Sequence, residues 1–219
     1  MRTSIAIAAT ISFLNSIYSP AHAELGKLEM DALKPLLGTT SVRYVPVTTR
    51  GELVACSLEY NASALDTHNK QGQPVVIVGN ISVGVSNGKV AGSLKVIVND
   101  FISIVPTIKM QPSVPAFIYL QTAGGVNNSK SIVKRFPSDT PGGLVAVFPT
   151  DDRFFQIVAD MIMKDEIIVV FNRTESGLDV RVPIDISIAD TVVENGVVNT
   201  KRAADTGEKF IECLERLGQ

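Results

Sequence analysis

The sequence predicts an α+β domain dominated by antiparallel strands, arranged as a sandwich or a strongly curved sheet with two or three helices. Two observations favour this class. Segments rich in Val and Ile recur along the chain, and turn residues such as Asn-Gly separate them, whereas helical spacing of apolar residues is confined to short stretches. The 219 residues contain no fixed repeat and no long linker. We therefore expect residues 24–219 to form a single β-rich domain.

The first 23 residues have the pattern of a cleavable secretory signal peptide. Arg2 supplies a positive start, residues 5–14 form an apolar core, and Ala21 and Ala23 provide the small side chains that signal peptidase requires. We place cleavage between Ala23 and Glu24. A membrane anchor would need about 20 apolar residues, more than this core offers. We expect a periplasmic or secreted product with no membrane span in the mature chain.

Composition and charge argue against nucleic acid as a partner. The formal net charge is −2, and Lys and Arg are spread evenly along the chain, so we expect no binding to nucleic acid. His68 is the only histidine after the leader.

The early elements follow from local patterns. Residues 25–38 have helix-like apolar spacing that Pro35 limits to a short helix or a turn. Strand signals begin near Gly51, and residues 51–60 alternate so that Cys56 and Leu58 share a face. Residues 74–100 predict a long hairpin with Asn87-Gly88 at its tip.

Later elements follow the same logic. Residues 114–122 and 143–148 are further strands, and their apolar character predicts cover on both faces. Thr150 is expected to cap a helix whose apolar face consists of Phe154, Ile157, Val158, Met161 and Ile162. Residues 166–190 predict a hairpin, with Leu178, Val180, Val182, Ile184 and Ile186 on its buried face. Asn195-Gly196 marks another turn, and Asp205 begins the final helix.

The two cysteines of the mature chain predict one disulfide. Cys56 and Cys213 are the only candidates, and an oxidising compartment favours their pairing. Helical spacing puts Cys213 on one face with Phe210 and Leu217, so the terminal helix should lie on the sheet face that shows Cys56. A redox-active pair is the alternative, but the sequence has no C-x-x-C motif.

Candidate polar residues are few. His68 follows Asp66 by two positions, and a carboxylate can orient an imidazole as a general base. No nucleophile motif accompanies the pair, so a solvated histidine is the simpler interpretation.

A second candidate is a set of carboxylates, formed by Asp100, Asp179, Asp185 and Asp190. Carboxylates on adjacent strands can catalyse sugar hydrolysis or bind a hard cation. Asp179 and Asp185 alternate with apolar residues, however, which puts them on the wet face of a strand. We assign no catalytic or metal-binding residue and expect no cofactor.

The C-terminal third resembles an uncharacterised family of exported proteobacterial proteins of the rhizobial type. The resemblance rests on residues 171–191, which contain an F-N-x-x-x-x-G-x-D-V-x-V-P-x-D stretch, and on the terminal F-x-x-C-L helix. Residues 51–66 are similar to the Cys-containing strand of that family. The resemblance implies export and a Cys56–Cys213 bond, and it implies no activity.

We therefore expect an exported, non-catalytic envelope protein that binds a partner protein or an envelope component through its surface. Two alternatives remain open: a carboxylate-dependent glycan hydrolase, and a carrier of a small apolar ligand that would need an enclosed apolar cavity.

Overall fold

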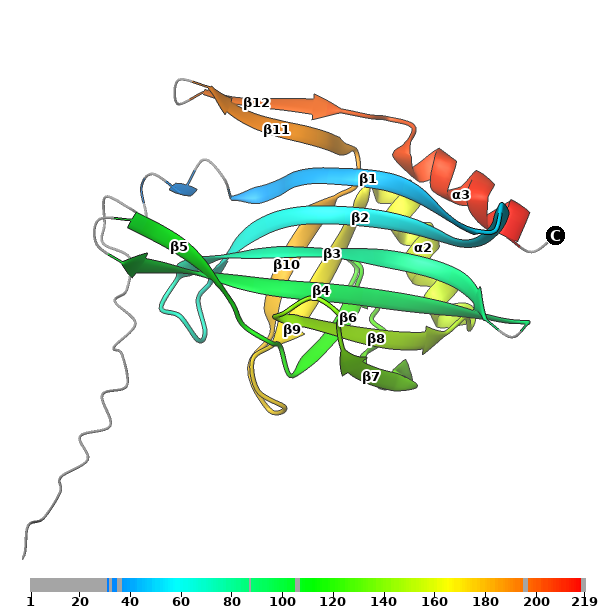
Figure 1. Cartoon of the computed structure of the whole chain (residues 1–219), viewed down its shortest axis with the longest axis horizontal. Helices are drawn as coiled ribbons and strands as arrows, with labels where there is room; N and C mark the ends of the chain where they lie inside the picture. Colours follow the sequence, from blue (N-terminus) through cyan, green and yellow to red (C-terminus); the bar gives the residue numbers. More distant parts are fainter. Residues whose placement is uncertain are drawn as a thin grey trace, which may run out of the picture.

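The computed structural model describes residues 31, 33, 34, 37–86, 88–104, 107–194 and 197–217. It confirms the predicted class, because antiparallel sheets and two α-helices form a sandwich-like α+β fold (Figure 1). The predicted cleavage site between Ala23 and Glu24 lies outside the described residues, as does most of the segment 25–36.

Seven strands form the large sheet. They are β1 (Gly38–Thr49), β2 (Glu52–Asp66), β3 (Gln73–Ser86), β4 (Lys89–Ile104), β5 (Thr107–Pro112), β7 (Lys134–Pro137) and β8 (Gly143–Pro149). The order is β1-β2-β3-β4-β8-β7. Strand β5 pairs with residues 99–104 of β4, and β8 pairs with residues 91–97. The predicted hairpin 74–100 is confirmed, and Gly88 at its tip has a φ of 71°.

Three strands form the small sheet, in the order β10-β9-β6: β6 (Phe117–Gln121), β9 (Glu166–Asn172) and β10 (Val180–Asp185). They cross behind the long strands β1–β4 (Figure 1). In the predicted hairpin 166–190, Val180, Val182 and Ile184 are buried as expected. Leu178 is 63% exposed, so its expected burial is wrong; it precedes β10, where the alternation has not begun.

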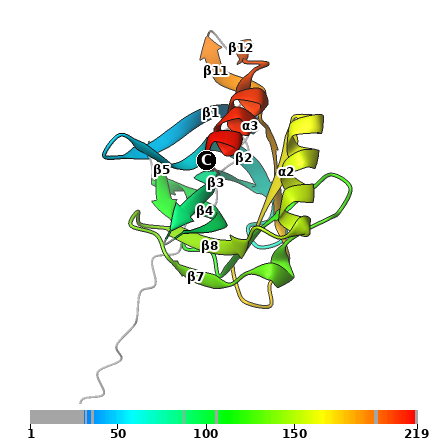
Figure 2. The same cartoon turned by 90° about the vertical axis from the view of Figure 1, so that its right-hand side faces the viewer.

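Two helices complete the second layer: α2 (Asp152–Lys164) and α3 (Thr206–Leu217) (Figure 2). The predicted cap of α2 is wrong. Asp151, not Thr150, caps the helix by accepting a hydrogen bond from the backbone N–H of Phe154 over 2.9 Å. Thr150 instead donates to the carbonyl oxygen of Val90.

The helices and the small sheet together cover one face of the large sheet. Phe154 of α2 packs over Gly92, where an added Cβ would lie 2.3 Å from its ring. The disulfide between Cys56 and Cys213 fixes α3 to β2, with a Cα–Cα distance of 5.9 Å. Both predictions, the bond and the face on which α3 lies, are confirmed.

Three strands of the large sheet were not predicted. Strand β1 was missed because its Thr residues and Pro46 obscure the alternation; Pro46 is tolerated because β1 is an edge strand. Strands β5 and β7 are short and lie beside segments rich in Pro.

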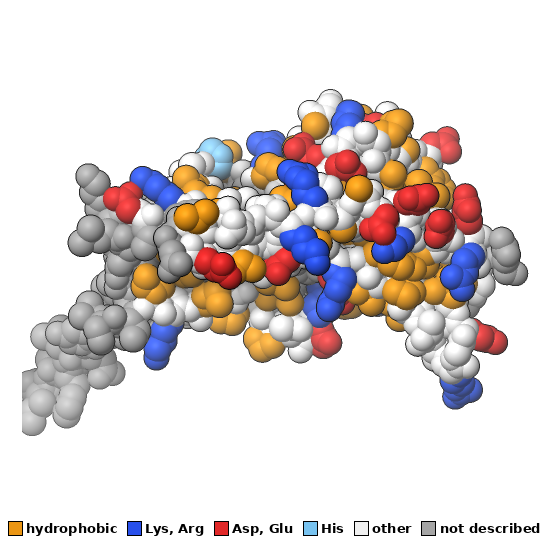
Figure 3. All heavy atoms as spheres, turned by 90° about the horizontal axis from the view of Figure 1, so that it is seen from above, with side chains coloured by type: hydrophobic (Ala, Val, Ile, Leu, Met, Phe, Trp, Pro, Cys, Tyr) orange, Lys and Arg blue, Asp and Glu red, His pale blue; other side chains and the backbone are white. Residues whose placement is uncertain are grey.

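A two-stranded ribbon forms a sheet of its own and lies beside β1 of the large sheet. Strands β11 (Ile188–Glu194) and β12 (Val197–Arg202) pair with each other, and the predicted turn residues Asn195 and Gly196 lie outside the described residues. Charges of both signs are scattered over the face seen in Figure 3, and acidic side chains gather toward the end that carries α3.

Candidate functional site

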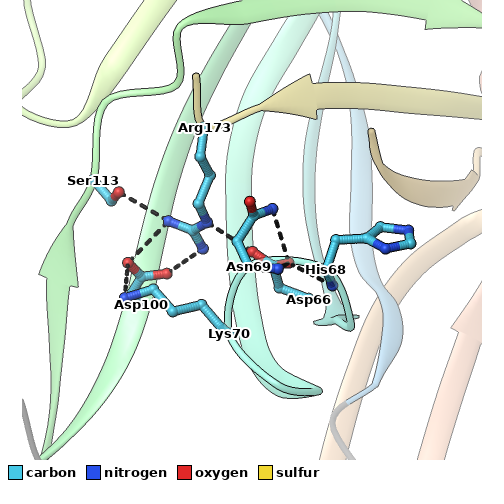
Figure 4. A network of polar contacts seen from close by, with 7 residues as sticks. All are labelled: Asp66, His68, Asn69, Lys70, Asp100, Ser113 and Arg173. Atoms are coloured by element: carbon cyan, nitrogen blue, oxygen red, sulfur yellow. Dashed lines mark hydrogen bonds and ion pairs between the residues drawn. The ribbon is translucent and has the colours of Figure 1, made fainter. Parts of the chain in front are cut away.

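A network of ion pairs joins three segments at one end of the sandwich (Figure 4). Arg173, the residue after β9, donates from Nε to Oδ2 of Asp66 over 2.7 Å and from Nη2 to Oδ1 of Asp100 over 2.5 Å. Its Nη1 also donates to Oδ2 of Asp100 (3.0 Å) and to Oγ of Ser113 (2.9 Å). Nζ of Lys70 lies 3.7 Å from Oδ2 of Asp100. The planar guanidinium thus ties β2, β4 and β9 together.

Asp66 is the most deeply buried member of the network. Its side chain is 0% exposed, and its Oδ1 accepts hydrogen bonds from the backbone N–H groups of Asn69 (2.9 Å) and His68 (3.3 Å). Burial alone would raise the pKa of Asp66, but hydrogen bonds from Asn69 and the charge and hydrogen bond of Arg173 outweigh it and hold the pKa below its ordinary value. Burial likewise opposes the charge of Arg173, yet its hydrogen bonds to Asp100 and Asp66 raise its pKa. The pair is held ionised.

The imidazole of His68 points away from this network (Figure 4). Asp66 accepts from the backbone nitrogen of His68, so it does not orient the ring as a general base. His68 instead lines a hollow of about 160 Å³ together with Leu65, Asp179 and Arg181. This hollow was not predicted from the sequence.

Asp179 belongs to a second polar group. Its Oδ2 accepts from Oη of Tyr119 over 2.7 Å and from Nη2 of Arg181 over 2.8 Å. Burial and the Asp179 carboxylate together raise the pKa of Tyr119 to about 12. Tyr119 therefore acts here as a hydrogen-bond donor that fixes Asp179.

Asp185 belongs to a third group. It accepts from the backbone N–H and hydroxyl of Ser187, and from Nη1 of Arg202 over 3.0 Å. Burial opposes its charge, but Ser187 and Arg202 hold its pKa below the ordinary value. Asp190 is exposed on β11 and lies opposite Lys201 of β12. The candidate carboxylates thus lie in separate contacts, and the described residues contain no cluster suited to a metal ion.

The outward face of the large sheet carries a different feature, a hollow of about 540 Å³. Cross-strand pairing aligns four of its polar residues in one row across β1, β2, β3 and β4: Arg43, Glu59, Asn80 and Lys95. Arg43 pairs with Glu59, and Lys95 pairs with Asp139 over 2.7 Å. This row forms a polar surface of mixed charge.

An apolar hollow of about 290 Å³ adjoins the polar one, and Asn61 lines both. Pro74 of β3, Phe101 of β4 and Met110 of β5 line this hollow, and Phe101 pairs with Met110 across β4 and β5. Met110 is 59% exposed, and Leu65, which pairs with Pro74 at the end of β2, is 41% exposed. We call the two hollows together the open-face groove. It follows the strands, with a polar end at Arg43 and Lys95 and an apolar end at Phe101 and Met110.

Sequence reasoning missed both the Arg173 network and the open-face groove. The one available signal was the alternation in residues 74–100, which puts Pro74, Val76 and Val78 on the face opposite Ile77 and Ile81. Apolar residues on the second face of a strand indicate cover or a docking surface, but only the register shows which side chains meet.

Comparison with known proteins adds no relative. No protein-family model matches the chain, and searches of curated proteins and of solved structures found no match. Within the described part of the chain, no helix combines the length and apolar character that crossing a bilayer requires.

Proposed function

We propose that the chain is an exported, non-catalytic binding protein whose open-face groove holds a segment of a partner protein of the cell envelope. Export is supported by the leader pattern of residues 1–23 and by the disulfide, because such bonds persist in oxidising compartments. The resemblance to exported proteobacterial proteins supports the same location.

The observation that carries the binding role is the exposed apolar hollow at one end of the open-face groove. Phe101 and Met110 lie opposite each other on β4 and β5, and Pro74 of β3, whose partner on β2 is Leu65, lines the same hollow. An apolar patch of this kind, next to a polar rim, is typical of a protein-docking surface.

The form of the groove favours a protein segment over a small ligand. A carrier encloses its ligand in an apolar cavity of about 300–1,000 Å³. The apolar hollow here is about 290 Å³ and includes exposed residues, while the interior beneath it is filled by side chains such as Ile77 and Leu58. Such a hollow suits one or two apolar side chains of a larger partner, whose polar groups would meet Glu59 and Lys95.

The carboxylate contacts argue against the hydrolase alternative. A glycosidase needs two carboxyl groups about 5–9.5 Å apart with room for a sugar between them. Asp66 and Asp100 face each other, but the guanidinium of Arg173 occupies the space between them. Of the remaining candidates, Asp179 and Asp185 each form an ion pair with an Arg elsewhere, and Asp190 lies opposite Lys201 on the ribbon.

Site-specific photo-crosslinking tests the proposal. A photoreactive phenylalanine analogue replaces Met110 in the groove or, as a control, Val133, which is 71% exposed outside it. We expect one discrete protein adduct from position 110 in intact cells, lost when Phe101→Ser is added and absent from position 133. No adduct from position 110, or equal adducts from both positions, would refute the binding role of the groove.

A further inference from the structure

We propose that the groove between α2 and α3 is a second docking surface, which takes a basic, amphipathic segment of a partner protein. The groove has a volume of about 480 Å³. Its apolar floor includes Ile162, Gly207 and Ile211, and its acidic rim includes Glu208, Glu212 and Glu215. It lies on other elements than the open-face groove and does not depend on the function proposed for that groove.

The floor of the helix groove is formed where α3 begins close to α2. Gly207 lies next to Ile162 there, because a Cβ added at Gly207 would be in ordinary contact, at 3.4 Å, with two carbons of Ile162. Ile211, one turn further along α3, remains 38% exposed. The partly exposed side chains of Ile162 and Ile211 give an incoming apolar side chain a surface to bury.

The rim of the groove carries one sign of charge. At about 100° per residue, Glu208, Glu212 and Glu215 fall on one strip of α3, while Lys209 and Arg216 fall on another flank. Lys209 is held by Asp205 over 2.7 Å. Glu208 and Glu215 form no ion pair within the described part of the chain. Asp165 adds a fourth carboxylate at the end of α2.

The inner face of α3 fixes the groove in place. Phe210 and Cys213 are buried, and the Cys56–Cys213 bond joins the helix to the large sheet. The acidic strip therefore faces outward from a helix whose orientation is fixed. Such a preorganised surface loses less conformational entropy when it binds a partner.

Charge and shape together identify the occupant. Carboxylates gathered along one rim repel nucleic acid and anionic lipid, whose phosphates are negative, and they attract Lys and Arg. The Ile floor between the Glu side chains requires an apolar group in the same ligand. A peptide segment in which Lys or Arg flanks Leu or a similar side chain meets both demands.

Fluorescence anisotropy with a labelled Leu/Lys amphipathic peptide tests this assignment on the mature, disulfide-bonded protein. We expect saturable binding that weakens as salt shortens the Debye length from about 10 Å at 0.1 M to about 3 Å at 1 M. The matched peptide with Glu in place of Lys should not bind. Glu208→Gln, Glu212→Gln and Glu215→Gln combined should weaken binding at least about tenfold.

The control variant removes the same number of charges elsewhere, through Glu52→Gln, Asp190→Asn and Glu194→Gln. It should bind like the parent protein, and Ile211→Asn should bind more weakly than Val133→Asn. Equal losses in the two triple variants would show a nonspecific charge effect and overturn the assignment. The absence of saturable binding would overturn it as well. Neither result bears on crosslinking at Met110.

Discussion

Nε of Arg173 donates a hydrogen bond to Oδ2 of Asp66 over 2.7 Å, although the two residues are 107 positions apart in the sequence. Through this contact the segment after β9 holds the end of β2, and Asp100 extends the connection to β4. The small and large sheets are therefore joined by charge at one end, while the Cys56–Cys213 bond joins α3 to β2. These contacts hold the open-face groove on a rigid support.

Replacing Arg173 should destabilise the fold strongly. Arg173→Met leaves the fully buried carboxylate of Asp66 without its cation, which costs about 3–5 kcal/mol of unfolding free energy. The control Arg181→Met breaks an exposed pair and should cost about 0–1 kcal/mol. Urea unfolding measures both. Adding Asp66→Asn to Arg173→Met should recover part of the loss; equal costs for the two single variants would contradict this account.

The same pair predicts the response of stability to acid. The pKa of Asp66 in the folded protein lies below its ordinary value of 3.8, so the carboxylate stabilises the fold at pH values above that value. This contribution is lost as the pH falls through the folded pKa. The difference in unfolding free energy between the parent protein and Asp66→Asn should thus be constant near neutrality and shrink below about pH 4. If the difference in unfolding free energy grew as the pH fell, the result would contradict a lowered pKa for Asp66 in the folded protein.

Loss of the disulfide should release α3. The bond closes a loop with a sequence separation of 157, for which the chain-entropy relation gives about 5 kcal/mol, and measured losses are commonly about 2–5 kcal/mol. Cys56→Ser with Cys213→Ser should lower the urea midpoint accordingly. A reductant should lower the midpoint of the parent protein by a similar amount and leave the variant unchanged. A parent protein indifferent to the reductant would contradict the structural role of the bond.

Gly79 should tolerate no side chain. A Cβ at this position would lie 1.9 Å from the carbonyl oxygen of Lys95 and 2.6 Å from Oη of Tyr60, which donates to that same oxygen over 2.8 Å. Gly79→Ala should cost about 3 kcal/mol or more in thermal or urea unfolding, because backbone must move. Gly124→Ala, where the nearest atom is 3.7 Å away, should be almost neutral. Equal effects would show that the sheet adapts freely at Gly79.

Local patterns were enough to predict much of the fold. The hairpin at Gly88 and the apolar face of α2 follow from residues that are close together in the sequence. The bond between Cys56 and Cys213 was predictable because the mature chain offers no other cysteine. Strand β1 was missed because an edge strand tolerates Pro46 and carries little alternation.

The site residues were harder to predict because they meet only through the tertiary structure. Nothing near Arg173 in the sequence indicates that Asp66 and Asp100 lie beside it, and Asp100 was considered with Asp179 and Asp185 instead. The apolar hollow lined by Pro74, Phe101 and Met110 likewise exists only through the pairing of strands that lie apart in the sequence.

The affinity of the crosslinked partner tests the central claim most directly. With the partner purified, we expect Phe101→Ser combined with Met110→Ser to weaken binding at least about thirtyfold, since losing two buried apolar anchors costs about 2 kcal/mol or more. Leu178→Ser, at a 63% exposed position outside the groove, should leave the affinity unchanged. Unaltered affinity in the groove variant would contradict the claim that the open face of the large sheet binds the partner.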